Sequence, residues 1–175
     1  MLNPVKVGIL GLGTVGGGTV SVLQRNAEEI ERRAGRGIVV SHACAKELNR
    51  NLPYSTDDMV ITTQLDDVVN NPEVEIVVEL MGGTTTARDM ILKAIANGKH
   101  VVTANKALIA HHGNEIFAAA RAKGVMVAFE AAVAGGIPII KAIREGLSAN
   151  KILWVAGIIN GTSNFILTEM REKGR

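Results

Sequence analysis

The chain has 175 residues, 47% of them hydrophobic but only 3% aromatic, and 19 Lys plus Arg against 17 Asp plus Glu give a net charge of +2. So small a positive excess gives no support for a nucleic-acid or membrane surface, and we expect neither kind of partner. This length allows one domain with a substantial core and the root of a second. Because aromatic residues are scarce, the core must consist of Val, Ile, Leu and Ala, the usual filling of a parallel sheet covered by helices.

The cysteine content and the hydropathy pattern predict a cytoplasmic protein. Cys44 is the only cysteine, so no internal disulfide can form, as is usual in a reducing compartment. It lies in an apolar run, which favours a small core residue over a reactive thiol. No run reaches the ~18 apolar residues of a membrane span. The first ten residues lack the charged region of a signal peptide and enter a strand directly.

Apolar stretches of strand length alternate with amphipathic stretches of helix length along the chain. The predicted strands cover residues 5–10, 38–45, 60–61, 74–80, 100–103, 125–129 and 151–159. The predicted helices cover residues 14–33, 65–70, 85–97, 107–123 (with a break near 111–113), 138–147 and 166–175. Gly98 and Gly124 mark two helix ends, and residues 46–58 predict a surface loop. Repeated strand–helix–strand units imply an α/β fold with a doubly wound parallel sheet.

A glycine-rich turn follows the first predicted strand. Residues 11–16 read Gly11-Leu12-Gly13-Thr14-Val15-Gly16, the spacing of a dinucleotide-binding fingerprint. Gly11 permits the tight turn, Gly13 allows a pyrophosphate to approach the backbone, and Gly16 allows the helix to pack against the strand. Free N–H groups at the helix N-terminus would bind the phosphates. Gly17 and Gly18 extend the glycines into the helix, which suggests close packing or close ligand approach.

The end of the second predicted strand bears on the choice between the two nicotinamide cofactors. An acid there would bind the adenosine ribose hydroxyls, whereas a base would neutralise a 2′-phosphate. The strand is followed by Lys46 and Glu47, with Arg50 nearby. Because Lys46 comes first, we favour NADP(H) over NAD(H). The alternative is that Lys46 is an ordinary solvated loop lysine.

Two further strand ends are expected to face the nicotinamide, since ligands of doubly wound sheets lie beyond the carboxyl ends of the strands. At the first, the small residues Gly83 and Thr84 would let the backbone approach the cofactor. At the second, Thr103 precedes Lys106, whose cation would polarise a carbonyl group or orient a polar substrate. The alternative for Lys106 is a surface lysine at a helix start, although the helix dipole disfavours a cation there.

Glu130 lies among apolar residues at the end of a predicted strand, where an unpaired buried charge would be very costly. It therefore needs a lysine, backbone N–H groups or a metal ion as its partner. A hard monovalent cation held mainly by carbonyl oxygens would suit the small-residue loop that follows. His111 and His112 point about 100° apart on a helix, and no Cys or acid completes a ligand set, so we do not expect a metal site there.

Five blocks of the sequence occur in a recognisable order and spacing. They are KVGILGLGTVGGG, VVELMGG, VVTANKALIA, FEAAVAGGIPIIKAI and GIINGTSNFIL. In these blocks the chain resembles the homoserine dehydrogenases almost from end to end. The resemblance implies a Rossmann-like fold and the reversible NAD(P)H-dependent reduction of aspartate 4-semialdehyde to homoserine, in the pathway to threonine, methionine and isoleucine. It also implies small-molecule partners and a homo-oligomeric intact protein.

The resemblance further assigns roles to individual residues. The phosphates would lie along Leu12, Gly13, Thr14 and Val15, the ribose near Lys46, and the nicotinamide near Gly83 and Thr84. Lys106 would be the catalytic lysine at the mouth shared by cofactor and substrate. A sodium ion would be held by the Glu130 carboxylate and the main-chain carbonyls of Val133, Gly135 and Ile137. The substrate-binding region would begin at Asn160, Gly161 and Thr162.

The family's substrate segment, with a GYAEADP-like run, an aspartate-rich stretch and a second essential lysine, would follow Arg175 and is absent. We therefore expect residues 1–135 to form an NAD(P)-binding domain. Residues 136–175 would form a connecting helix and the start of an incomplete substrate and dimerisation domain. Such a chain would bind cofactor and turn over poorly or not at all. The alternatives are a stand-alone dinucleotide-binding or sensor module, and another NAD(P)-dependent dehydrogenase of an aspartate-related substrate.

Overall fold

The computed structural model describes residues 2–47, 54–157 and 160–174. Six strands form one sheet in the order β3-β2-β1-β4-β5-β6, and every neighbouring pair is parallel. The strands are β1 Val5–Leu10, β2 Ile38–Cys44, β3 Val60–Thr62, β4 Ile76–Glu79, β5 His100–Thr103 and β6 Val127–Ala128. The chain thus starts in the middle of the sheet with β1. The strands β2 and β3 are added toward one edge, and β4, β5 and β6 are then added toward the other. This order confirms the predicted doubly wound, Rossmann-like fold.

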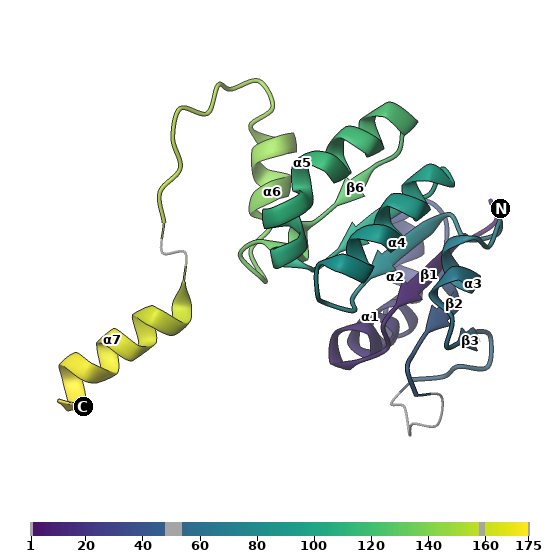
Figure 1. The fold of residues 1–175 in the computed structure, drawn as a ribbon, viewed down its shortest axis with the longest axis horizontal. Helices are drawn as coiled ribbons and strands as arrows, with labels where there is room; N and C mark the ends of the chain where they lie inside the picture. Colours follow the sequence, from purple (N-terminus) through teal and green to yellow (C-terminus); the bar gives the residue numbers. More distant parts are fainter. Residues whose placement is uncertain (1, 48–53, 158–159, 175) are drawn as a thin grey trace.

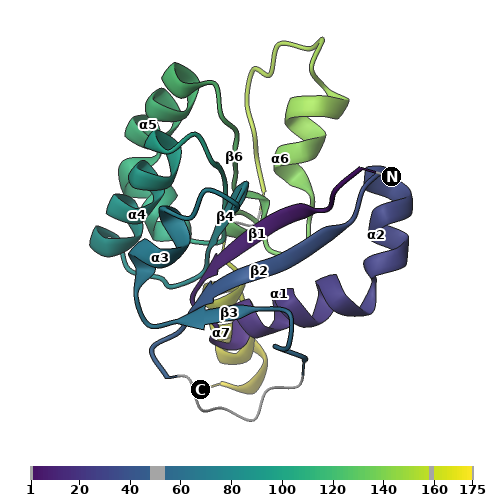
Figure 2. The ribbon, with the colours of Figure 1, turned by 90° about the vertical axis from the view of Figure 1, so that its right-hand side faces the viewer.

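Helices cover both faces of the sheet, which Figure 2 shows between them. The helices on one face are α1 Thr14–Arg25 and α2 Ala27–Ala34, and those on the other are α3 Leu65–Val69, α4 Thr85–Ala96 and α5 Lys106–Lys123. The later elements are a 3-10 turn η1 Glu130–Ala132, α6 Ile139–Lys141, a π-helical turn η2 Ala142–Gly146, and α7 Gly161–Lys173. α6 runs directly into η2, and α7 lies apart from the sheet (Figure 1).

Two hydrophobic clusters, one on each face, attach the helices to the sheet. Ile91 of α4, and Leu108 and Ile116 of α5, are fully buried in the larger cluster. Ile9 of β1 and Val20 of α1 are fully buried in the smaller one. Each such side chain contributes roughly 1.5–3 kcal/mol by leaving water. The core is aliphatic, as the scarcity of aromatic residues predicts.

The helix predicted over residues 14–33 is two helices. Asn26 separates α1 from α2 with φ −108° and ψ 20°, although its N–H still bonds to the Val22 carbonyl at 3.1 Å. Asn is a poor interior helix residue and a good cap, so the chain turns there. The helix break predicted near residues 111–113 is wrong, since α5 is continuous from Lys106 to Lys123. Gly113 is buried, and a Cβ there would lie 3.3 Å from the Phe117 ring, so tight packing offsets the low helix propensity of glycine.

Two predicted strands are also corrected. The strand predicted over residues 125–129 is only β6, Val127–Ala128. The strand predicted over residues 151–159 is not formed by residues 151–157, and residues 158–159 lie outside the described residues. Residues 151–157 are exposed and run away from the sheet (Figure 1), so they have no neighbouring strand with which to pair.

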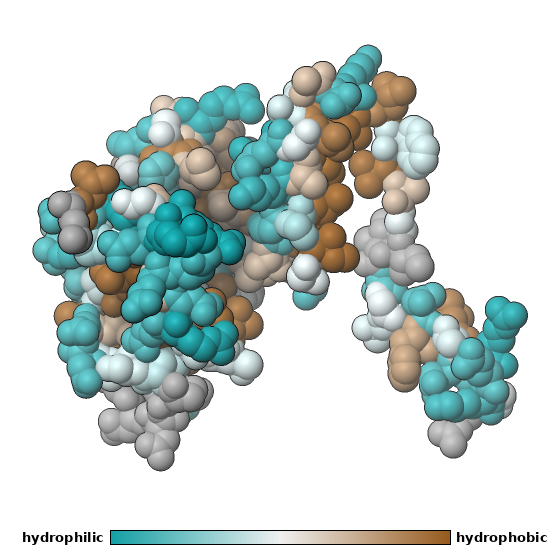
Figure 3. All heavy atoms as spheres, turned by 180° about the vertical axis from the view of Figure 1, so that it is seen from behind, coloured by the Kyte–Doolittle hydropathy of each residue, from teal (hydrophilic) through white to brown (hydrophobic). Residues whose placement is uncertain are grey.

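The exposed hydrophobic side chains of the C-terminal part stand out from the rest of the surface. Leu153 and Trp154 are each 78% exposed, and Phe165 of α7 is 64% exposed. Figure 3 shows hydrophobic side chains on the side of the body that faces the separate α7. Among the helices of the described residues, none has the length and apolarity to cross a membrane.

Candidate functional site

The glycine-rich turn between β1 and α1 has the geometry that its sequence predicts. Gly11 has φ +101°, a region that favours glycine, and its N–H donates to the Cys44 carbonyl at 2.9 Å. A Cβ on Gly16 would lie 1.9 Å from the Gly11 carbonyl oxygen, so the helix can begin this close to the turn only without a side chain. A Cβ on Gly17 would lie 3.0 Å from the Tyr54 ring, whereas one on Gly18 would meet open space. Of the two predicted explanations, close packing or close ligand approach, close packing therefore holds for Gly17 and not for Gly18.

The N-terminus of α1 is suited to an anion. Gly13 occupies the N-cap position, where it has no side chain to accept from the first N–H groups of the helix. The first turn contains no acidic residue, and a Cβ on Gly13 would have no described atom within 4 Å. Of the neighbouring predicted residues, Leu12 is buried, while Thr14 and Val15 are exposed. Free N–H groups, the helix dipole and an open approach together favour a bound phosphate.

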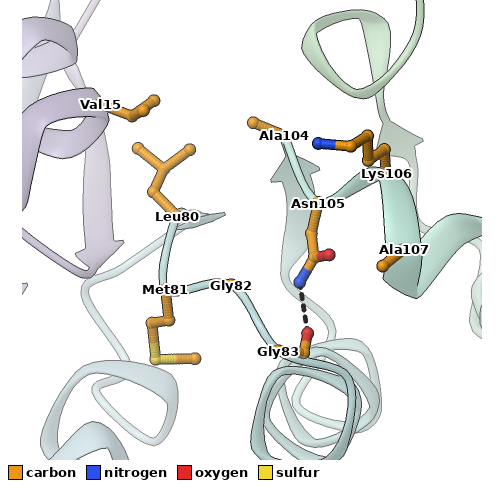
Figure 4. Close-up of a pocket in the computed structure, with 9 residues that line it drawn as sticks. All are labelled: Val15, Leu80, Met81, Gly82, Gly83, Ala104, Asn105, Lys106 and Ala107. Atoms are coloured by element: carbon orange, nitrogen blue, oxygen red, sulfur yellow. Dashed lines mark hydrogen bonds between the residues drawn. The ribbon is translucent and has the colours of Figure 1, made fainter.

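Two pockets follow the carboxyl ends of the strands from this turn. The first, of about 540 Å³, includes Gly11, Gly13, Lys46 and Thr86. The second, of about 400 Å³, is lined by Val15, Leu80, Met81, Gly82, Gly83, Ala104, Asn105, Lys106 and Ala107 (Figure 4). Leu80, Met81 and Gly82 line both pockets, so the two are halves of one cleft. The cleft lies beyond the carboxyl ends of the paired strands β1 and β4, where the chain leaves for α1 on one face and α4 on the other. Doubly wound sheets bind ligands at this position.

The first pocket contains the residue predicted to choose the cofactor. Lys46 follows β2, is exposed and lines the pocket together with Glu47. In the described part of the chain, no hydrogen bond or ion pair holds the Lys46 ammonium, so it is available to a ligand. A cation in this position is the feature that favours a 2′-phosphate.

Cys44 also lines the first pocket, and as predicted it is a buried free cysteine, 5% exposed. Burial raises the pKa of its thiol, so little thiolate is present near neutral pH. We expect Ellman's reagent to react with the native chain at least about tenfold more slowly than with the urea-unfolded chain. Saturating NADPH should slow the native reaction further. Because Cys44 is the only cysteine, the signal has one source, and an equally fast native reaction would contradict a buried thiol.

In the second pocket, Lys106 faces the loop that follows β4. It is the first residue of α5 and is exposed, and its ammonium takes part in no hydrogen bond or ion pair among the described residues. Figure 4 shows its ammonium directed toward the open space between the two loops. Gly83 lies on the opposite loop, with Thr84 at the N-cap of α4 just outside the pocket lining. The structure thus brings together Val15, Gly83 and Lys106 from three strand ends.

Sequence reasoning predicted Thr103 at this strand end but assigned no role to Glu79, its partner beneath the pocket. Glu79 and Thr103 are both fully buried, and the Thr103 hydroxyl donates to the Glu79 carboxylate at 2.7 Å. Thr103 therefore lies below the pocket rather than in its lining. Asn105 caps α5 by accepting from the Leu108 N–H at 3.1 Å, and its amide donates to the Gly83 carbonyl at 2.6 Å. The sequence did contain an indication of a role for Glu79, because it is an acid at the end of an otherwise apolar strand.

The predicted ion ligand Glu130 is half-buried, and backbone N–H groups are its partners. Its two carboxylate oxygens accept from the Ile140 and Lys141 N–H groups, each at 2.9 Å. Glu130 thus stabilises the first turn of α6 from outside the helix. The sequence predicted a lysine, backbone N–H groups or a metal ion as the partner of Glu130, and in the structure its hydrogen bonds are to backbone N–H groups. Within the residues that the structure describes, no group of three or more His, Cys, Asp and Glu side chains is placed to hold a metal.

The other predicted ligands lie in the loop between Glu130 and α6. Val133 is half-buried and extended, whereas Gly135 and Ile137 are exposed. Ala134 between them has φ +47°, an unusual conformation for a residue other than glycine. The loop is therefore sharply turned beside Glu130.

The predicted substrate residues are at the start of α7. Asn160 is the N-cap, and its side chain accepts from the Ser163 N–H at 3.0 Å. Gly161 and Thr162 form the first turn and are exposed. None of the three lines either pocket, and α7 lies away from the sheet (Figure 1).

Comparison with known proteins agrees with this geometry. Residues 11–130 match the family model described as homoserine dehydrogenase, NAD binding domain, and residues 138–175 match the model described as homoserine dehydrogenase. A homoserine dehydrogenase of Pseudomonas aeruginosa is 70% identical over 174 residues, which are 99% of this chain and 40% of that protein. The chain spans about two fifths of the length of this relative.

Solved structures show the same fold. The crystal structure of a homoserine dehydrogenase from Thiobacillus denitrificans has a TM-score of 0.90 and 64% identity, covering 99% of this chain and 40% of that one. A hyperthermophilic archaeal homoserine dehydrogenase in complex with NADPH has a TM-score of 0.79 and 25% identity, covering 98% of this chain and 57% of that one. Since the NAD-binding model alone matches more than half of its residues, the chain belongs to the homoserine dehydrogenase family.

Proposed function

We propose that this chain binds NADP(H) or NAD(H), and that the whole protein reversibly reduces aspartate 4-semialdehyde to homoserine. The observation that carries the proposal is the open helix N-terminus at Gly13, from which one cleft leads to Lys106. A bound nicotinamide cofactor would supply the hydride. Family membership and the archaeal relative solved with NADPH support this choice of cofactor.

In the proposed complex the cofactor follows the cleft. The diphosphate binds at residues 11–16, and the adenosine ribose lies near Lys46, with its 2′-phosphate giving a preference for NADP(H). The nicotinamide lies between Val15 and Gly83, and Thr84 and the buried Thr103 support that end. Lys106 then orients the substrate carbonyl and stabilises the charge that develops on its oxygen.

The remaining predicted site residues lie outside the two pockets. We propose that Asn160, Gly161 and Thr162 begin the substrate region, and that the NAD(P)-binding domain ends near residue 135. We also propose a sodium ion held by Glu130 and the carbonyls of Val133, Gly135 and Ile137, for which the sharp turn at Ala134 gives support. The whole protein is proposed to be a cytoplasmic homo-oligomer, which is consistent with the lone buried thiol and the exposed apolar side chains near α7.

Calorimetric titration of the chain with NADPH, and separately with NADH, tests the proposal. We expect NADPH to bind more tightly, and Lys46→Ala to weaken NADPH about tenfold while changing NADH less than twofold, since only NADPH carries the 2′-phosphate that a cation favours. Lys151→Ala is the matched control, because Lys151 is exposed and lines neither pocket. Absence of binding by both cofactors would overturn the proposed function. Equal weakening of both by Lys46→Ala would overturn the cofactor preference alone.

A further inference from the structure

We propose that Glu79 is the positioning residue for the nicotinamide end of the cleft, where its buried carboxylate fixes the two loops that face each other across the second pocket. The inference rests on the proposed binding of a nicotinamide cofactor. Glu79 does not line either pocket, so it acts through the backbone of the loops rather than on the ligand.

The Glu79 carboxylate is surrounded by hydrogen-bond donors. Its Oε1 accepts from the Met81 N–H at 2.9 Å and from the Gly82 N–H at 3.2 Å, and its Oε2 accepts from the Thr103 hydroxyl at 2.7 Å. A carboxylate only accepts, and the three bonds use both of its oxygens. The bonds to Met81 and Gly82 fold the loop back over the end of β4. Gly82 and Gly83 are there held at φ +75° and +73°.

Thr103 connects the Glu79 carboxylate to the second loop, which follows β5. It is the direct neighbour of Glu79 in the parallel register of β4 and β5. Its oxygen accepts from the Asn105 N–H at 3.0 Å, and the Asn105 amide donates to the Gly83 carbonyl at 2.6 Å (Figure 4). Glu79, Thr103 and Asn105 thus close a ring of hydrogen bonds around the pocket floor. Lys106 directly follows Asn105 in the chain, so this ring also holds the backbone beside Lys106.

A purely structural role does not explain this choice of residue. Burying a carboxylate is costly, and an apolar side chain would fill the end of a strand at less expense. Among the described residues, no Lys or Arg pairs with Glu79, so the hydrogen bonds to Met81, Gly82 and Thr103 are its compensation. What these bonds determine is the shape of both loops at the pocket. Preorganised loops bind a ligand without a further ordering cost.

The test compares two ligands that differ only by the nicotinamide: NADPH and 2′-phospho-ADP-ribose. Glu79→Gln keeps the size of the side chain but replaces one acceptor oxygen by an NH2 donor, so either the Thr103 hydroxyl or the Met81 and Gly82 N–H groups lose their acceptor. We expect it to weaken NADPH about tenfold and 2′-phospho-ADP-ribose less than twofold. The fluorescence emission of bound NADPH should also shift toward that of free NADPH. Glu75→Gln is the matched control, since Glu75 accepts from the Lys6 N–H at the amino end of β4, away from the cleft, and both affinities should stay unchanged.

A second pair of variants covers the case in which Glu79→Gln does not fold. Thr103→Val removes the hydroxyl and should reproduce the selective loss of NADPH affinity, while Thr103→Ser retains the hydroxyl and should bind as the parent does. If the parent chain binds both ligands and these variants weaken both equally or neither, the positioning role is wrong while cofactor binding stands. If the parent chain binds neither ligand, the proposed function is wrong, and so is the positioning role that rests on it.

Discussion

Gly16→Ala should destabilise the chain by about 3 kcal/mol and abolish NADPH binding. The added Cβ would lie 1.9 Å from the carbonyl oxygen of Gly11, a backbone atom that no side-chain rotation can move. Either the turn or the start of α1 must shift, and both form the proposed phosphate site. Urea unfolding followed by circular dichroism measures the free energy of unfolding, and calorimetry measures the affinity for NADPH.

Two neighbouring glycines provide matched controls for this prediction. Gly18→Ala adds a methyl group where no described atom lies within 4 Å, so it should bind NADPH normally and gain up to about 1 kcal/mol from helix propensity. Gly13→Ala also meets open space in the chain itself, and it should fold but bind NADPH poorly because its Cβ occupies the approach to the phosphates. A Gly16→Ala variant as stable as its parent would contradict the predicted steric clash.

Lys99→Met should destabilise the chain by about 3 kcal/mol at neutral pH, because one buried and one partly buried carbonyl oxygen lose their donor. Lys99 is only 4% exposed, at the amino end of β5, and its ammonium donates to the carbonyls of Asn71 and Val74. These bonds attach the loop between α3 and β4 to the strand beside it. Lys93→Met is the control, since Lys93 forms an exposed ion pair with Asp66 that contributes about 1 kcal/mol or less.

The pH dependence of stability gives a second signature of Lys99. Burial lowers the pKa of its ammonium below the value of 10.5 expected in the unfolded chain. Between these two pKa values the unfolded chain binds more protons, so the contribution of Lys99 to stability rises with pH throughout that window. The neutral amine still has N–H groups for both carbonyls. The stability difference between the parent and Lys99→Met should therefore increase from pH 7 to pH 10.

Comparing the parent with the variant at each pH removes the opposing contribution of Cys44. Burial raises the pKa of that thiol, so its contribution is present below the unfolded pKa and is lost as the pH rises through the folded pKa. It is common to both proteins and cancels in the difference. A difference that is constant or shrinks with pH would show that Lys99 is not held in a desolvated site.

The sequence predicted the central strands, β1, β2, β4 and β5, to within two residues at each end. It was much less successful at the periphery, where β6 is shorter than predicted and residues 151–157 form no strand. Central strands are buried on both faces, so an apolar run is sufficient to identify them. A peripheral strand exists only where a neighbour supplies hydrogen bonds, and the local residue pattern does not contain that information.

The sequence by itself determined the doubly wound sheet, the turn and packing roles of Gly11 and Gly16, and membership in the family, because each follows from the order of residues along the chain. Only the tertiary structure decided which polar atoms meet. Glu79 and Thr103 are 24 residues apart and touch because β4 and β5 are in register. Glu130 accepts from the backbone of α6, ten and eleven residues further on. The residue pattern fixes turns and hydrophobic periodicity, whereas the partner of a buried carboxylate is set by the packing of distant segments.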